Sequence, residues 1–312
     1  MHTRRSVVII GNFDGVHRGH QRLISLARQR AEQLADQRGS LPVLAVTFWP
    51  HPMSVVSPDR APKLLSDLPD RVELLQQAGV DEVRVVQFNR EVAGWQPEYF
   101  IDTILRPLNP ALVVVGENFR FGRGASGSIL TLREAGREDF DVQAAELLSV
   151  DEQVTSSSVI RQALIAGDVE AAAENLGRNF RVRGIVVVGD QRGRHLGFPT
   201  ANLPVSSDFA VPADGVYAGW LTRLDEPDAE RLPAAISVGT NPTFAGVERR
   251  VETYVLDRVD LRLYGVEIAV EFVKQLRGQM KFDSVEALIE QMTADVASTR
   301  AVLEVAPQRA KR

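Results

Sequence analysis

The first third of the chain begins with a strand-like spacing of hydrophobic residues and continues with a helix-like one. Residues 7–10 form a short, uninterrupted apolar run, which is typical of a strand buried on both faces of a parallel sheet. Gly11 ends this run, and turn-forming residues follow as far as Gly15. Beyond them, apolar residues recur at helical spacing at Leu23, Ile24, Ala27, Leu34 and Ala35. The pattern predicts a strand, a turn and a helix.

Strand-like and helix-like segments then alternate. Residues 41–48, 80–88 and 111–116 read as three more strands, and residues 66–79 and 97–105 read as helices between them. Such an alternation predicts a parallel, doubly wound α/β sheet.

The pattern changes near Arg178, where short β-rich segments separated by turn residues replace the alternation. These segments predict a small antiparallel β-barrel. An amphipathic helix over residues 284–303 would cover it with one apolar face, formed by Val285, Leu288, Ile289, Met292 and Val296. We therefore predict an α/β plus β protein, with a doubly wound domain at 1–177 and a barrel domain at 178–312.

Composition narrows the class of protein. A chain of 312 residues is comfortable for two domains. The formal net charge is −5 and no block of basic residues occurs, which disfavours a nucleic-acid polymer as partner. The absence of cysteine excludes disulfides and a thiol nucleophile. No stretch has membrane-spanning length and the N-terminus lacks a signal-peptide core, so we expect no membrane association and a cytoplasmic location.

The turn after the first strand carries candidate chemistry. A helix N-terminus at the carboxyl end of a parallel strand presents N–H groups and partial positive charge to anions. His17 and His20 lie three residues apart, so both can donate to one phosphate, and Gly19 leaves room between them. A metal site is disfavoured because no third ligand stands at a recognisable spacing. Ordinary polar residues at a helix start remain the plain alternative.

Two further segments of the first domain are candidates. Residues 116–128 follow a strand, and four glycines accompany Arg120 and Arg123, so the stretch reads as a binding loop or as a solvated surface loop. Residues 155–168 read as a serine-capped helix from whose first turns Arg161 projects. Neither pattern is specific by itself.

In the second domain, residues 189–204 contain little that could form a core strand and place Thr200 and Asn202 on a loop. Hydroxyl and amide oxygens are plausible ligands for Mg²⁺ and phosphates. A simple turn would also explain why Thr200 and Asn202 occur here. Further on, Arg250, Glu252 and Tyr254 alternate with apolar residues and so share one face of a strand. A glutamate in such a place is ordinarily just solvated.

Longer strings carry a family resemblance for the first domain. GNFDGVHRGH resembles the HxGH signature of the nucleotidyltransferase superfamily and, more narrowly, its FAD synthetase branch. TSSSVIRQ resembles the second motif, SSTxIR, with Ser158 where threonine is usual. The resemblance implies that Ser157 and Arg161 contact ATP phosphates beside His17 and His20. It also implies ATP contacts at Gly11, Asn12, Phe13, Asp14, Gly19 and Asn118, and flavin contacts in TFWPHP at Phe48, Pro50, His51 and Pro52.

The second domain resembles another family. GRHLGFPTANL, PADGVYAGW and ISVGTNPTF resemble bacterial riboflavin kinase, a six-stranded barrel. The resemblance implies that Thr200 and Asn202 hold Mg²⁺ and ATP phosphates, that Gly197 contacts ATP, and that Glu252 is the general base for the ribityl hydroxyl.

Together the chain resembles the bifunctional riboflavin kinase/FAD synthetases of bacteria. This implies conversion of riboflavin and ATP to FMN, followed by transfer of AMP from a second ATP to FMN, giving FAD and pyrophosphate. Mg²⁺ would serve both steps, and weak homo-oligomerisation is left open.

Three departures from the family's pattern stand beside the resemblance. Relatives usually have a segment before the first strand, which begins here at Ser6, so the domain edge is expected to be shortened or the start to lie upstream. Tyr254 stands where histidine is frequent. Residues 256–265 are longer than the usual hairpin, with Arg262 in place of an aspartate.

Two other functions stay open from the sequence. One is an adenylyltransferase for another mononucleotide or for phosphopantetheine, with a barrel that only binds or regulates. The other is a non-catalytic flavin carrier, in which His17, His20, Thr200 and Glu252 would have no catalytic reason to occur together.

Overall fold

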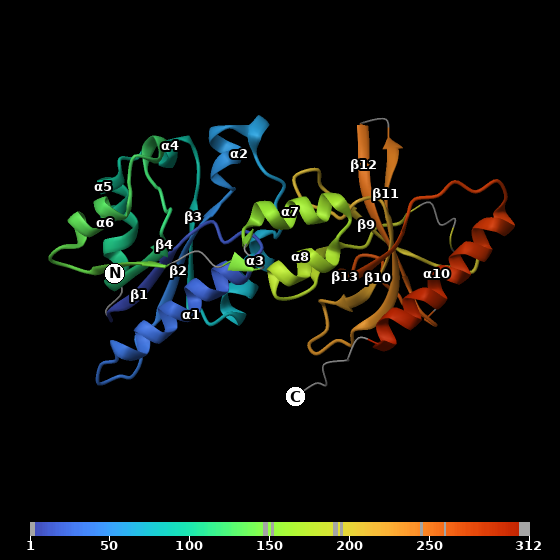
Figure 1. Cartoon of the computed structure of the whole chain (residues 1–312), viewed down its shortest axis with the longest axis horizontal. Helices are drawn as coiled ribbons and strands as arrows, with labels where there is room; N and C mark the ends of the chain where they lie inside the picture. The colour runs from blue at the N-terminus through green and yellow to red at the C-terminus, as the bar shows by residue number, and fades with distance from the viewer. Residues whose placement is uncertain are drawn as a thin grey trace. The chain divides into compact units, whose positions relative to one another are not determined.

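The computed structural model describes residues 4–145, 149–150, 153–189, 193, 196–243, 246–258 and 260–305 (Figure 1). The chain divides into two compact units, Met1–Ser157 and Ser158–Arg312. Each unit contains its own large sheet, parallel in the first and antiparallel in the second.

The sheet of the first unit has five parallel strands in the spatial order β3-β2-β1-β4-β5. Because the order reverses between β1 and β4, their carboxyl ends flank the place where sheets of this kind bind ligands. The predicted doubly wound sheet is confirmed, with one strand that the hydrophobic pattern did not reveal. That strand is β5, at the sheet edge, whose sequence DVQAA has no apolar run. The strands are β1 (Ser6–Ile10), β2 (Val43–Trp49), β3 (Glu82–Gln87), β4 (Pro110–Gly116) and β5 (Asp141–Ala145).

Helices cover both faces of this sheet, which explains the uninterrupted apolar run in β1. Val7 and Ile9 face a core completed by α1 (Arg18–Gln33) and α3 (Leu68–Gln77). Val8 and Ile10 face the opposite core, completed by residues of α5 (Pro97–Phe100), the π-helical turn η2 (Ile101–Leu105) and α6 (Ile129–Gly136). Short elements complete the unit: α2 (Pro52–Val56), η1 (Pro58–Arg60), α4 (Arg90–Ala93), η3 (Arg106–Leu108), η4 (Arg123–Ala125), β6 (Ser149–Val150) and β7 (Gln153–Val154).

The second unit is built on a six-stranded antiparallel sheet in the order β8-β13-β10-β11-β12-β9. A bridge between Val187, just beyond β8, and Asn202 in β9 joins the two edges, so the predicted barrel is confirmed. Phe180, Tyr217 and Phe272 pack their rings together in its core. The strands are β8 (Phe180–Ile185), β9 (Ala201–Val205), β10 (Gly215–Arg223), β11 (Leu232–Thr243), β12 (Gly246–Val255) and β13 (Glu267–Gly278).

Strand β9 corrects the loop predicted over residues 189–204. Ala201 and Leu203 are buried and pair with Thr253 and Val251 of β12, while Asn202 lies between them on the strand. The apolar alternation is only three residues long, and the partner strand lies about fifty residues away in the sequence. Local pattern could not show that β12 completes this strand.

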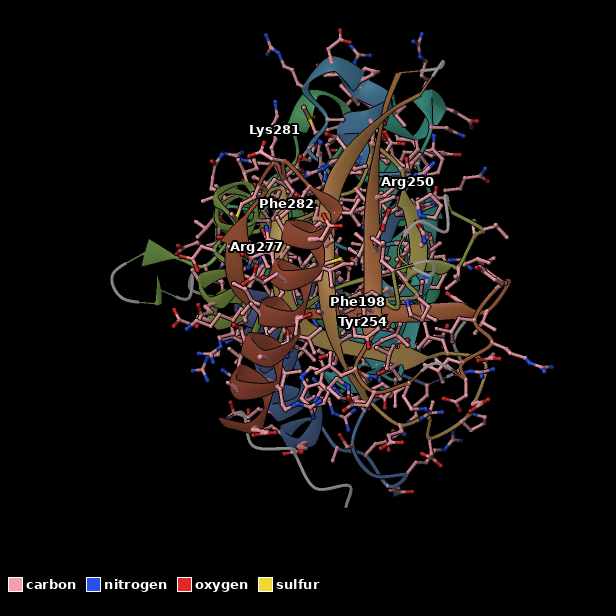
Figure 2. All side chains as sticks on the ribbon, turned by 90° about the vertical axis from the view of Figure 1, so that its right-hand side faces the viewer. Phe198, Arg250, Tyr254, Arg277, Lys281 and Phe282 are labelled. Carbon is pink, nitrogen blue, oxygen red and sulfur yellow. The ribbon has the colours of Figure 1, made fainter. Side chains whose placement is uncertain are left out.

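Helix α10 (Val285–Val305) lies across the sheet of the second unit (Figures 1 and 2). Its predicted apolar face is partly wrong, because Val285 is 53% exposed. The buried positions near its middle and end are Asp295, Thr299 and Leu303, and Leu303 packs on Ala218 and Trp220 of β10. Buried Asp295 is tolerated because Arg277 of β13 forms a two-pronged ion pair with it at 2.6 and 3.0 Å.

Helices α7 (Ser157–Ala166) and α8 (Val169–Leu176) precede the predicted boundary at residue 177, yet nearly all of this pair lies in the second unit. The amide of Ala213 donates to the carbonyl of Leu164 at 2.9 Å, and Lys274 of β13 pairs with Glu170 at 3.3 Å.

Among the described residues no helix is long and apolar enough to cross a membrane.

Candidate active sites

The turn between β1 and α1 has an irregular backbone held by a buried ring. Phe13, Gly15 and Val16 have positive φ angles of 50°, 78° and 40°. The Phe13 side chain is fully buried, and a Cβ at Gly11 would lie only 3.2 Å from its ring. Phe13 therefore shapes the turn from within the core, and its side chain is not available to a nucleotide.

The two histidines meet at the start of α1. His17 occupies the N-cap position, and its ring stacks on that of His20 with 3.6 Å between centroids. A Cβ at Gly19 would lie 3.1 Å from the His17 ring, so the room beside Gly19 is taken by that ring. The two imidazoles thus form one compact group beside the first N–H groups of a helix.

The electrostatic setting of His20 favours its neutral form. Removal from water lowers the pKa of His20 well below its usual value, and the nearby His17 and Arg71 lower it further. The Phe13 ring is an apolar neighbour of His20 and packs on it in a T-shaped contact, with 5.2 Å between the ring centroids. Nδ1 of His20 has no hydrogen-bond partner in the described part of the chain. A neutral imidazole can donate one N–H to an anion.

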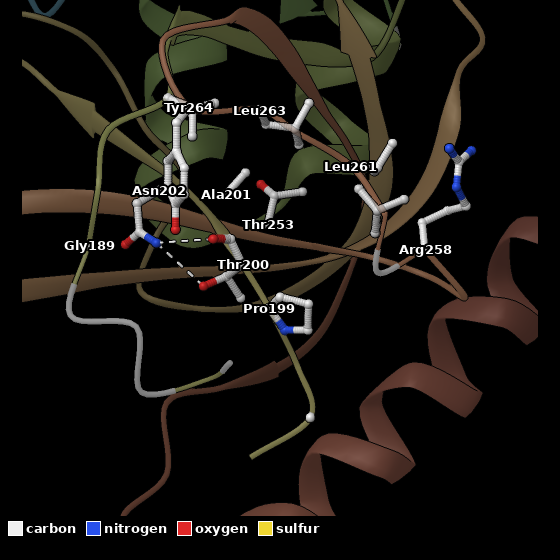
Figure 3. A pocket seen from close by; sticks show the side chains of 13 residues that line it. Gly189, Pro199, Thr200, Ala201, Asn202, Thr253, Arg258, Leu261, Leu263 and Tyr264 are labelled. Atoms are coloured by element: carbon white, nitrogen blue, oxygen red, sulfur yellow. Dashed lines mark hydrogen bonds between the residues drawn. The ribbon is translucent and has the colours of Figure 1, made fainter. Parts of the chain in front are cut away.

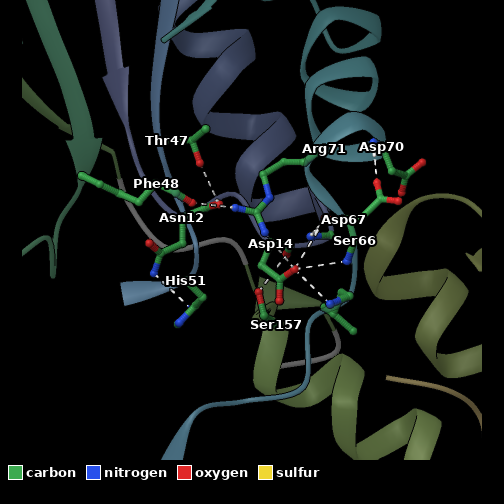
Figure 4. Close-up of polar contacts among 12 residues, drawn as sticks. Asn12, Asp14, Thr47, Phe48, His51, Ser66, Asp67, Asp70, Arg71 and Ser157 are labelled. Carbon is green, nitrogen blue, oxygen red and sulfur yellow. Dashed lines mark hydrogen bonds and ion pairs between the residues drawn. The ribbon is translucent and has the colours of Figure 1, made fainter. Parts of the chain in front are cut away.

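Asp14, predicted to contact ATP, has its carboxylate engaged inside the protein (Figure 4). It is 2% exposed, accepts from the amides of Leu65 and Ser66 at 2.9 and 3.2 Å, and lies 3.5 Å from Nη2 of Arg71. Its carbonyl accepts from the hydroxyl of Ser157 at 3.0 Å. Asp14 thus ties the turn to two distant segments, which sequence spacing could not reveal.

Among the predicted flavin contacts, Phe48 is a core residue that packs on Phe88 and Phe100. His51 caps α2 by accepting from the amide of Met53 at 3.2 Å, and its Nε2 lies 3.5 Å from the amide nitrogen of exposed Asn12. Of these predicted contacts, Pro50 is exposed and Pro52 is partly exposed.

The other two candidate segments of the nucleotide site lie as follows. Loop 116–128 folds back on itself through a bridge between Phe121 and Gly127, with Asn118 and both of its arginines exposed. Ser157 begins α7, and Arg161 lies on the same helix within the second unit. The loop is therefore partly ordered by its own backbone pairing.

The second candidate site surrounds Thr200 and Asn202 (Figure 3). The Asn202 amide donates to the carbonyl and hydroxyl oxygens of Thr200 at 3.3 and 3.4 Å. Asn202 is 5% exposed, and its Oδ1 has no hydrogen-bond partner among the described residues. A cavity of about 350 Å³ opens here, lined also by Gly197, Thr253 and Tyr264. A buried oxygen acceptor of this kind suits a bound cation or a donor on a ligand.

Glu252 shares a cross-strand row with Asn202. In register, Glu252 of β12 lies opposite Asn202 of β9 on one side and Ser237 of β11 on the other. Directly opposed residues of antiparallel strands project from the same face, so the three side chains form one polar row. A second cavity of about 430 Å³ lies against this row and is lined by Glu252, Ser237, Arg250 and Gln279.

Thr253 is a polar residue that sequence reasoning missed. Its side chain is buried, and Oγ1 has no hydrogen-bond partner within the described ranges. Thr253 lies on the same strand face as Val251 and Val255. The sequence therefore marked it only by a hydroxyl on an otherwise apolar face. Nearby, Tyr254 packs edge-on against Phe198, with ring centroids 5.3 Å apart (Figure 2).

Comparison with known proteins assigns a family to each half of the chain. A family model described as FAD synthetase matches residues 1–159, and one described as riboflavin kinase matches residues 176–303. The bifunctional riboflavin kinase/FMN adenylyltransferase of Escherichia coli strain K12 is 37% identical over 296 residues, covering 94% of this chain and 91% of that relative. The chain belongs to this family. The predicted family, fold class and pair of enzyme activities are thereby confirmed.

Two further comparisons agree with this family and fold. The Bacillus subtilis strain 168 member is 36% identical over 301 residues, covering 93% of this chain and 90% of the relative. A crystal structure described as a macrolide-efflux protein from Streptococcus pneumoniae superposes with a TM-score of 0.84 at 32% identity, covering 96% of this chain and 95% of that one. That description belongs to the other protein, and the superposition supports the fold of each unit.

Proposed function

We propose that this chain makes FAD from riboflavin in two steps, each in its own half. The barrel would phosphorylate riboflavin with ATP to give FMN, and the doubly wound domain would transfer AMP from a second ATP to FMN. The observation that carries this proposal is the pair of family matches, each of which falls on a half with its own candidate phosphate site. We propose that the functional modules divide near residues 177 and 178.

For the kinase step, we propose Glu252 as the general base. Its carboxylate would take the proton of the primary ribityl hydroxyl as that oxygen attacks the γ-phosphorus of ATP, and ADP would leave. Thr200 and Asn202, with Gly197 beside them, would hold the phosphates. The shared row of Glu252 and Asn202 supports this arrangement, because it places a base beside an oxygen ligand on one face.

The oxygen donors of this site fit Mg²⁺. The Thr200 hydroxyl and the buried Oδ1 of Asn202, which has no hydrogen-bond partner among the described residues, are hard ligands of the type that magnesium prefers. When bound, the ion would neutralise phosphate charge. In the described ranges no cluster of three or more His, Cys, Asp or Glu side chains could hold a metal, so the carboxylate-poor set would need the phosphates themselves as further ligands.

For the adenylyl step, an oxygen of the FMN phosphate would attack the α-phosphorus of ATP, and pyrophosphate would leave. Neutral His20 would donate its N–H to the phosphate oxygen on which charge grows, beside His17 and the N-terminus of α1. Arg161 would neutralise the departing pyrophosphate. Since the Ser157 hydroxyl already donates to the backbone carbonyl of Asp14, we propose that Ser157 holds the turn in place.

Substrate contacts of the first domain follow from exposure for the asparagine and proline side chains, and from the family resemblance for buried His51. We propose that Asn12 and Asn118 reach ATP with their side chains, that Gly11, Phe13, Asp14 and Gly19 act through the backbone, and that Pro50, His51 and Pro52 contact the flavin. Phe48 would support this motif from the core.

Three further properties stay predictions: a cytoplasmic location, weak homo-oligomerisation and the absence of a nucleic-acid partner.

The test is to incubate the protein with riboflavin, Mg²⁺ and ATP and to separate the flavins chromatographically over time. FMN should appear first and FAD second, and supplied FMN should yield FAD directly. A yellow protein that converts neither substrate would indicate a flavin carrier. FMN formation without adenylylation would remove the function proposed for the first domain.

A further inference from the structure

An arginine beside the first site is buried in a way that its sequence does not suggest. Arg71 lies in the first turn of α3, where a charged residue would ordinarily be solvated, yet it is 0% exposed. It is the largest fully buried side chain among the described residues. None of the roles assigned above includes it.

The guanidinium of Arg71 connects three segments of the first unit (Figure 4). Nη1 donates to the carbonyl of Phe48 at 3.2 Å, and Nη2 lies 3.5 Å from Oδ1 of Asp14. Its Cζ lies over the ring of Trp49, 5.4 Å from the centroid. Arg71 therefore joins α3 both to the turn that carries the histidines and to the end of β2, where Phe48 and Trp49 begin the proposed flavin motif.

Stability alone is a poor explanation for this buried charge. Nε has no hydrogen-bond partner among the described residues, and the ion pair with Asp14 is long. Buried ion pairs with imperfect geometry often stabilise a protein no better than apolar side chains of the same volume. Burial lowers the pKa of Arg71, and Asp14, Asp67 and Asp70 oppose that shift.

The position of the charge suggests what it does. Among the described residues, the groups whose charge lowers the pKa of His20 are His17 and Arg71, and Asp14 pairs with the latter. Adenylyl transfer must bring the α-phosphorus of ATP, at the histidine turn, within bonding distance of an FMN phosphate held near the end of β2. A misplacement of about 1 Å can reduce such a rate by about 10²-fold.

We propose that Arg71 is a positioning residue for adenylyl transfer, which clamps the histidine turn against the end of β2 and directs a fixed positive charge at His20. This inference rests on the proposed adenylyl-transfer function of the first domain. The effect on His20 has a defined sign. Removing the positive charge would raise the pKa of His20, so its protonated form would persist to higher pH.

The experiment compares Arg71→Gln, which removes the charge, with Arg71→Lys, which keeps it, in the full chain. We measure the pH dependence of kcat/KM for FAD formation from supplied FMN. R71Q should lower kcat/KM about tenfold or more and move its acidic inflection to higher pH, because the clamp is weakened and the positive charge is lost. R71K should recover most of the rate and the inflection. Thermal unfolding of the first unit serves as the control for folding, and FMN formation from riboflavin, which belongs to the other unit, should not change.

An R71Q protein with the wild-type rate and inflection would overturn the inference. If R71Q fails to fold, Asp14→Asn is measured instead. This variant keeps an oxygen acceptor for the amides of Leu65 and Ser66 while removing the opposing negative charge, so the inflection should move to lower pH. An unshifted profile in D14N would also overturn it. If His20→Ala leaves FAD formation intact, the proposed function itself is wrong, whatever the Arg71 variants do.

Discussion

The surroundings of the candidate site residues are set by neighbours that are distant in sequence. The His17 and His20 rings stack because three residues of helix separate them. Burial and His17 lower the pKa of His20, and Arg71, about fifty positions away, lowers it further. The row of Ser237, Glu252 and Asn202 likewise exists only because three strands pair in one register.

Replacing His20 by alanine should lower FAD formation from supplied FMN by about 10²-fold or more, since a donor aimed at the growing phosphate charge is lost. FMN formation should persist, because the barrel is unchanged. Assays of both steps on one preparation provide the measurement and its control. A near-normal rate of FAD formation would exclude the proposed role.

Glu252→Gln should lower FMN formation by about 10²-fold or more, because the amide keeps the size of the side chain but cannot accept the ribityl proton. Adenylylation of supplied FMN should continue. Glu267→Gln on β13, which removes the exposed carboxylate that pairs with Arg183, is a matched control and should leave kinase activity intact. Loss of riboflavin affinity with an unchanged kcat would instead assign Glu252 to binding.

The low pKa of His20 also predicts a pH dependence of stability. In the window between its lowered folded pKa and its unfolded value of about 6.5, the unfolded chain binds more protons, so the stability of the first unit should rise with pH. His20→Gln should flatten that dependence. Denaturant unfolding of wild type and H20Q between about pH 5 and 8 is the measurement, and parallel curves for the two proteins would contradict the prediction.

At the scale of elements, both candidate sites lie where a strand ends or meets an edge. The histidine turn follows β1 beside the switch point of the parallel sheet, and Asn202 lies in the edge strand β9, where a single bridge to Val187 joins the barrel. The amphipathic pattern predicted a helix that covers the barrel, whereas the polar residue Asp295 proved central to its attachment.

Asp295→Ala should destabilise the second unit by about 3–5 kcal/mol, because Arg277 would remain largely buried without its carboxylate partner. Thermal unfolding monitored by the riboflavin kinase activity that survives heating is the readout. Asp225→Ala removes a carboxylate from the exposed pair with Arg223 and should change little. Equal effects of the two variants would show that the buried pair has no special role.

At the scale of the whole molecule, the helix pair α7 and α8 decides where the chain can be cut. The predicted module boundary lies after this pair, but Leu164 and Glu170 bond to the barrel side of the chain. Gly167 lies so close to Gln275 that a Cβ there would come within 2.8 Å of its amide. The pair is therefore part of the packing of the second unit.

A fragment of residues 158–312 should fold and make FMN but no FAD, since it keeps Thr200, Asn202 and Glu252 and lacks His17 and His20. A fragment of residues 178–312 should have the same activity with a lower melting temperature, because it loses the contacts of α7 and α8. Kinase assays and thermal melts of both fragments test this. A folded 158–312 fragment without kinase activity would mean that the first domain completes the kinase site.

The sequence by itself determined the features that depend on neighbours along the chain. These are the buried run of β1, the turn with its two histidines, the alternation of strands and helices, and the change to clustered strands near Arg178. The spacing of hydrophobic residues and the residue types of a turn are local properties, so they can be read from one strand or helix at a time. The motifs GNFDGVHRGH and GRHLGFPTANL added the family, which the comparisons confirmed.

Only the tertiary structure decided which residues meet across long separations. It placed Asn202 in a strand by pairing it with Glu252, buried Arg71 between Asp14 and Phe48, and turned the Asp14 carboxylate away from solvent. A charged residue in a helical pattern looks the same whether it is solvated or buried, because burial depends on what packs against it. Register and burial are properties of contacts between distant segments, and no local pattern records them.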